Sequence, residues 1–140
     1  MGFLIDSGVW IEVERGRLAV ADVHAVTKSQ PVFISPVTIA EMQLGAELIA
    51  DKTVRLKCLA FLRRLKRKPL LRIDAQTGEV LFGTLAARLH RTGRGHQFRV
   101  QDLWLAAQAV QRRFMLLALN ERDFRDIPEL DLVVMKQPGG

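Results

Sequence analysis

The sequence has few of the features that would place it outside a reducing, aqueous compartment. A single cysteine, Cys58, excludes an internal disulfide. The longest apolar run, residues 114–119, is far too short to cross a bilayer. No basic segment precedes the first apolar residues and Asp6 interrupts them, so a secretory signal is not expected. These absences predict a cytoplasmic protein.

What the chain does have is enough apolar material for a core. Hydrophobic residues make up 49% of its 140 residues, and no repeat or linker divides them. We therefore expect one domain over residues 1–136, followed by a flexible end at 137–140. The net charge of +6 favours polyanionic partners such as nucleic acid.

Short apolar segments alternate with segments of helical periodicity. The expected strands are residues 3–5, 32–34, 70–73, 114–119 and 132–134. The expected helices are residues 7–14, 18–28, one that begins at Ser35-Pro36, one through 54–65, one from the cap Asp74 to Arg91, and 103–110. This alternation predicts an α/β fold with a central, mostly parallel sheet.

Four acidic residues stand where the strands of such a sheet end or the next helices begin. Asp6 and Asp123 follow apolar strands, whereas Glu41 and Asp102 lie in the first turns of helices. Ligand sites in parallel sheets form beyond the carboxyl ends of the strands. Neighbouring parallel strands would therefore bring all four side chains to one edge.

Each acid also has a purely structural explanation. Asp6 fits a helix N-cap, and Thr38 with Glu41 fits a capping box. Asp102 could complement a helix dipole, and Asp123 could be an ordinary loop residue.

Convergence of the acids would need more than capping to stabilise it. A cap contributes about 1 kcal/mol. Two like charges 4 Å apart repel by about 4 kcal/mol at an effective dielectric constant near 20. A cation among the carboxylates would remove that cost, and an oxygen-only ligand set suits Mg²⁺ or Mn²⁺.

The order of four motifs resembles a known family. The segments "FLIDSGVWI", "ISPVTIAEM", "VQDLWLAAQAV" and "LNERDF" are similar to those of PIN domains, in particular the VapC-type ribonuclease toxins of bacterial toxin–antitoxin pairs. The resemblance extends from Phe3 to about Val134. It implies a three-layer α/β/α fold around a mostly parallel sheet.

The resemblance also implies roles for individual residues. The catalytic, metal-binding acids would be Asp6, Glu41, Asp102 and, at the family's more variable fourth position, Asp123. Ser7 and Asn120 would support the site. Ala118 stands where the family commonly has threonine, which leaves Asp126 as an alternative to Asp123.

The activity that the resemblance implies is metal-dependent hydrolysis of RNA phosphodiester bonds, with Mg²⁺ or Mn²⁺ as cofactor. The implied partners are the RNA substrate, a cognate antitoxin and a second copy of the chain. Arg94 and Arg99, in the loop before Asp102, are candidates for RNA contact. The basic residues 63–68 are either a second RNA contact or a solvated helix end.

Other classes of function fit less well. A haloacid-dehalogenase-like phosphatase needs a second acid two residues after Asp6, where this chain has Gly8. A PIN-like module that binds RNA or a partner without cleavage stays open, because of Ala118. Trp10 and Trp104 are expected to pack in a core or dimer interface rather than to stack on bases.

Overall fold

The computed structural model describes residues 2–93 and 100–136. The expected flexible end at 137–140 lies outside these ranges. In chain order the elements are β1 (Phe3–Ile5), α1 (Ser7–Glu14), α2 (Val20–Thr27), β2 (Val32–Phe33), α3 (Pro36–Glu47), α4 (Lys52–Leu65), α5 (Ala75–Glu79), the π-helical segment η1 (Val80–Ala86), α6 (Ala87–Arg91), α7 (Val100–Arg112), β3 (Met115–Ala118), the 3-10 turn η3 (Glu121–Asp123) and β4 (Asp131–Val134).

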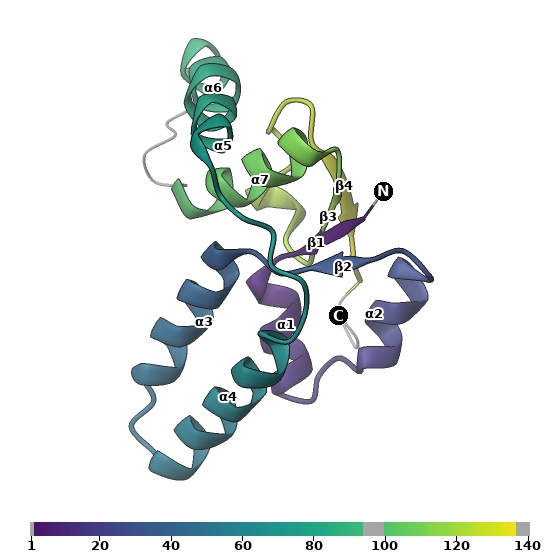
Figure 1. The fold of residues 1–140 in the computed structure, drawn as a ribbon, viewed down its shortest axis with the longest axis vertical. Coiled ribbons are helices and arrows are strands. Elements are labelled where there is room, and N and C mark those ends of the chain that lie inside the picture. Colours follow the sequence, from purple (N-terminus) through teal and green to yellow (C-terminus); the bar gives the residue numbers. More distant parts are fainter. Residues whose placement is uncertain (1, 94–99, 137–140) are drawn as a thin grey trace.

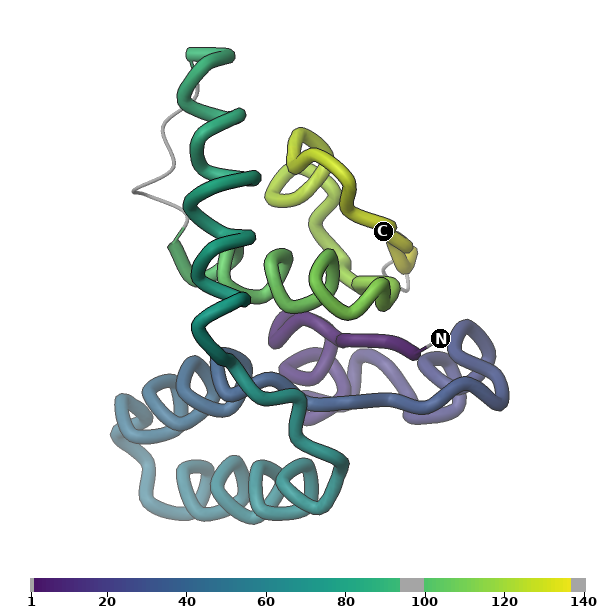
Figure 2. The backbone as a smooth tube through the Cα atoms, turned by 45° about the horizontal axis from the view of Figure 1, so that its top comes forward, coloured from purple at the N-terminus to yellow at the C-terminus, as the bar shows by residue number. Residues whose placement is uncertain are grey.

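The sheet is parallel throughout, as the alternation of strands and helices predicts. Its order is β2-β1-β3-β4, with Leu4 paired to Phe33 on one side and to Leu116 on the other. Helices α1 to α4 gather on one side of the sheet, and α5 to α7 on the other (Figures 1 and 2). The three-layer architecture is therefore confirmed.

The two faces of the sheet explain why its strands are continuously apolar. Leu4 packs into the core formed with α6 and α7, whereas its neighbours Phe3 and Ile5 pack into the core on the α1 side. In β3, Leu116 and Leu117 divide in the same way. Because both faces are covered, no position of these strands needs a polar side chain.

Local signals fix several element ends. The Ser35 hydroxyl accepts a hydrogen bond from the Val37 N–H, and Pro36 occupies the first turn of α3, as expected. Asp74 caps α5, which continues through η1 and α6 to Arg91 as the predicted helix. Gly16 follows α1 with φ +78°, a conformation that glycine adopts without strain.

One expected strand, residues 70–73, is wrong. Only Leu70 forms an isolated bridge, to Ile34. Ile34 donates its N–H to the Pro69 carbonyl and accepts from the Leu71 N–H. At Ser35, however, the segment that contains Ile34 turns into α3. With no extended neighbour left, residues 71–74 cross instead towards α5, and this crossing is visible in both views (Figures 1 and 2).

None of the described helices is both long and apolar enough to span a membrane.

Candidate active site

The four acids come from four elements around the carboxyl end of the sheet. Asp6 directly follows β1, and the Asp6 N–H donates to the Leu117 carbonyl of β3 at 2.9 Å, which joins the ends of the two central strands. Glu41 lies in α3, which follows β2, and Asp102 lies in the first turn of α7. Asp123 ends the 3-10 turn η3 just beyond β3.

Asp6 is both a helix cap and a half-buried charge. Its carboxylate accepts from the Gly8 N–H at 3.4 Å. The pKa of Asp6 is raised from 3.8 to about 6, first because burial disfavours the charged form and second because Glu41 repels it. The N–H groups of Gly8 and Ser7 lower this pKa, and the charge of Asp123 raises it further.

Glu41 couples electrostatically to Asp6, which follows β1, and to Asp102 of α7. Its pKa is raised, first by burial and then by the charge of Asp102, while a hydrogen bond from Ser7 opposes the rise. The Ser7 hydroxyl donates to Glu41 Oε2 at 3.4 Å. Electrostatic interactions therefore run from Asp123 through Asp6 and Glu41 to Asp102, so the fold brings the four acids into one electrostatically coupled group.

Of the two capping explanations for these acids, the structure bears out one and contradicts the other. The N-cap explanation of Asp6 is correct, yet a cap alone does not raise a carboxyl pKa. The capping box at Thr38 and Glu41 is wrong, because Ser35 caps α3 and Thr38 is fully buried inside the helix. This leaves Glu41 free of a capping role and turned towards Ser7.

Asn120 caps the turn that carries the fourth acid, Asp123. Asn120 is exposed, and its side chain accepts from the Arg122 N–H at 3.2 Å, so it caps η3 and fixes the turn that carries Asp123. The influence of Asp123 on the pKa of Asp6 favours Asp123 over Asp126 as the fourth acid. Ala118 is fully buried at the end of β3.

The basic residues considered for RNA contact fall into two groups. Arg94 and Arg99 fall outside the described residues. In the 63–68 cluster, Arg64 lies over the Phe61 ring and Lys68 over the Trp10 ring, at 5.7 and 5.5 Å from the ring centroids. Trp10 itself is 4% exposed and packs in the core, as expected.

A groove beside Glu41 was not anticipated from the sequence. It encloses about 580 Å³ between α1, α3 and α4. Apolar side chains such as Ile11, Met42 and Val54 line it, together with Arg15 and Arg17. The only signal in the sequence was the apolar spacing of these helices, which equally well describes a closed core.

The chemistry of the four acids fits a hard divalent cation. All donors are carboxylate oxygens, with the Ser7 hydroxyl beside them, and this is the ligand type that Mg²⁺ and Mn²⁺ prefer. Burial and, second to it, mutual repulsion raise the pKa values of Asp6 and Glu41, and a cation would relieve the repulsion. Within residues 2–93 and 100–136, however, no three acidic, histidine or cysteine side chains lie close enough together to form a compact ligand cluster as they stand.

A parallel α/β domain with coupled acids at the carboxyl edge of its sheet defines the class of this protein. The family model of the PIN domain matches residues 3–130. The chain therefore belongs to the PIN domain family.

Two individual relatives align with this chain over almost its whole length. Ribonuclease VapC of Rickettsia bellii is 26% identical over 135 residues, which cover 96% of this chain and 97% of the relative. Ribonuclease VapC1 of Rickettsia felis is 26% identical over 139 residues, with the same coverage.

Solved structures share the fold. The structure of VapBC2 from Rickettsia felis, bound to a DNA fragment from its promoter, matches with a TM-score of 0.80 at 21% identity and covers 97% of this chain and 100% of that chain. DNA-bound VapBC from Salmonella typhimurium matches with a TM-score of 0.79 at 23% identity, covering 96% and 98%.

Proposed function

We propose that this single PIN domain is a divalent-metal-dependent endoribonuclease and the toxin of a toxin–antitoxin pair, acting in the cytoplasm. The observation that carries the proposal is the electrostatic coupling of Asp6, Glu41, Asp102 and Asp123 at the carboxyl edge of the sheet. Relatives named as VapC ribonucleases, aligned over nearly the full length, support the reaction class.

The four acids would hold Mg²⁺ or Mn²⁺, and when bound the cation would activate water and neutralise charge that develops on the scissile phosphate. Ser7 orients Glu41 through its hydroxyl, and Asn120 fixes the turn that presents Asp123. The basic balance of the chain attracts RNA, and Arg94 and Arg99 are proposed to contact it.

The proposed protein partners are a cognate antitoxin and a second copy of this chain. Structures similar to this one include VapBC toxin–antitoxin complexes. The groove beside Glu41 offers an antitoxin an apolar surface that leads to the acids, so a segment bound there would cover the site.

Substitution of Asp102 tests the proposed reaction. We expect Asp102→Asn to lower RNA cleavage with Mg²⁺ or Mn²⁺ by more than about 100-fold, because even the outer partners of metal ligands contribute 10–100-fold. The measurement is cleavage of labelled RNA by protein freed of any antitoxin.

Asp22 provides a matched control. It also lies in the first turn of a helix, α2, where its carboxylate accepts from the Ala19 N–H at 2.9 Å. Asp22→Asn is expected to cleave like the wild type. If the wild type cleaves no RNA with either metal, the nuclease proposal fails and a PIN-like module that only binds RNA or a partner replaces it.

A further inference from the structure

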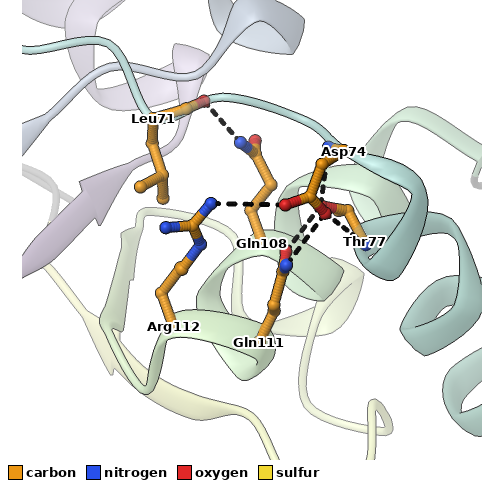
Figure 3. A network of polar contacts seen from close by, with 6 residues as sticks. All are labelled: Leu71, Asp74, Thr77, Gln108, Gln111 and Arg112. Atoms are coloured by element: carbon orange, nitrogen blue, oxygen red, sulfur yellow. Dashed lines mark hydrogen bonds and ion pairs between the residues drawn. The ribbon is translucent and has the colours of Figure 1, made fainter.

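Gln108 is a polar side chain in the middle of an apolar helix face. It is fully buried in α7, between alanines and leucines of the core. Both ends of its amide are used: Nε2 donates to the Leu71 carbonyl at 2.6 Å, and Oε1 accepts from the Ser35 hydroxyl (Figure 3 shows the bond to Leu71). A buried amide that satisfies both ends specifies a single arrangement of its partners.

The partners of Gln108 belong to the segments that position Glu41. Ser35 is the N-cap of α3, and its oxygen also accepts from the Val37 N–H. Leu71 lies in the segment that crosses between the helical layers, and its N–H donates to the Ile34 carbonyl. Gln108 therefore ties α7 to the two segments that the Ile34–Leu70 bridge joins, at the point where α3 begins.

This attachment works against a repulsion. Helix α3 carries Glu41 and helix α7 carries Asp102, and these like charges disfavour a close approach of the two helices. Burial of apolar side chains brings the helices together but is non-directional. The hydrogen bonds of Gln108 are a directional contact between α7 and the start of α3.

We propose that Gln108 is a positioning residue for the metal site: through Ser35 and Leu71 it holds the helix of Glu41 in register with the helix of Asp102. This inference rests on the proposed metal-dependent function. It assigns Gln108 no contact with metal or RNA.

The same helix contains a matched control one turn later. Gln111 Nε2 donates to Asp74 at 3.0 Å, and Gln111 Oε1 accepts from the Thr77 hydroxyl at 2.5 Å (Figure 3). Gln111 thus ties α7 to the start of α5, which carries none of the four acids. The two glutamines make similar bonds to different helices.

Replacement of each glutamine by methionine keeps the side-chain volume and removes the hydrogen bonds. We expect Gln108→Met to weaken Mn²⁺ binding, measured by isothermal titration, by about 10-fold. The Mn²⁺ concentration for half-maximal RNA cleavage should rise by the same factor, with the KM for RNA at saturating metal unchanged. Gln111→Met should bind Mn²⁺ like the wild type, and thermal unfolding checks that both variants fold.

Several results would overturn the inference. If a folded Gln108→Met binds Mn²⁺ like the wild type, or if both variants lose affinity equally, Gln108 has only a structural role. If the wild type itself neither binds Mn²⁺ nor cleaves RNA, the proposed function fails together with this inference.

A second pair keeps the test decisive if Gln108→Met does not fold. Ser35→Ala and Thr77→Ala each remove one hydroxyl that donates to a glutamine of α7. Only Ser35→Ala should weaken Mn²⁺ binding. Equal affinities in this pair would also overturn the inference.

Discussion

Asp6 and Asp74 are both N-caps, yet their carboxyl groups are perturbed in opposite directions. Asp6 is half-buried and faces the charges of Glu41 and Asp123, so its pKa is raised to about 6. Asp74 is exposed and accepts hydrogen bonds from Thr77 and Gln111, with Arg112 nearby, so its pKa is lowered.

The difference shows how to separate a structural carboxylate from a candidate functional one. The surroundings of Asp74 supply donors and a cation, with Arg112 Nη2 3.6 Å from Asp74 Oδ2. The surroundings of Asp6 supply two N–H groups but also two further acids. Folding stabilises the charge at Asp74 and destabilises it at Asp6, and such destabilised charges cluster at functional sites.

Among these predictions, the largest difference is expected in RNA cleavage, between the asparagine variants of the two caps. Asparagine caps helices about as well as aspartate, so both variants are expected to fold. Asp6→Asn should lower RNA cleavage by more than about 100-fold, because it removes a proposed metal ligand. Asp74→Asn should cleave RNA like the wild type, and equal losses in the two variants would break the comparison.

The free energy of unfolding should depend on pH in opposite senses at the two caps. Because folding raises the pKa of Asp6 from 3.8 to about 6, ionisation of Asp6 should lower the free energy of unfolding of the wild type by up to about 3 kcal/mol as pH rises from 4 to 7. Asp6→Asn removes this loss, so its stability relative to wild type should increase over that range. Urea unfolding of both proteins in metal-free buffer, at several pH values, measures this difference in the free energy of unfolding.

Asp74 should behave in the reverse way. Its lowered pKa contributes stability that is present above pH 4 and is lost as pH falls through the folded-state pKa. The destabilisation of Asp74→Asn should therefore shrink below pH 4. A pH dependence of the same sign in both variants would contradict the comparison.

Metal binding should also distinguish the two caps. If Mn²⁺ binds at the four acids, a concentration 100 times its dissociation constant stabilises the wild type by about 2.7 kcal/mol. Asp74→Asn should gain the same stability, and Asp6→Asn much less, in thermal unfolding with and without Mn²⁺. An equal gain in Asp6→Asn would place the metal elsewhere.

Local sequence signals predicted much of the fold. The strand β1, the bounds of α1 and the caps at Ser35 and Asp74 follow from neighbouring residues alone. Helix α7 extends from Val100 to Arg112, beyond the expected 103–110, and Gln101 and Asp102 lie in its first turn. The strand expected at residues 70–73 failed because a strand needs a neighbour, and the chain beside it turns into α3.

The candidate site was likewise predicted in part from the sequence and decided in part by the structure. The positions of the acids along the chain predicted that they share one edge of a parallel sheet, and the resemblance to PIN domains supplied their roles. The sequence offered two caps for α3, Ser35 and Thr38, and the choice of Ser35 became clear only when Thr38 was found buried in the helix.

The sequence by itself determined most of the helices and strands, with residues 70–73 as the exception, because periodicity, caps and turns act between residues close in the chain. Only the tertiary structure decided that Asp6 is held at a raised pKa and Asp74 at a lowered one. It alone also placed Gln108 between Ser35 and Leu71. Burial, repulsion and buried hydrogen bonds depend on residues that are distant in the chain and become neighbours only when it folds.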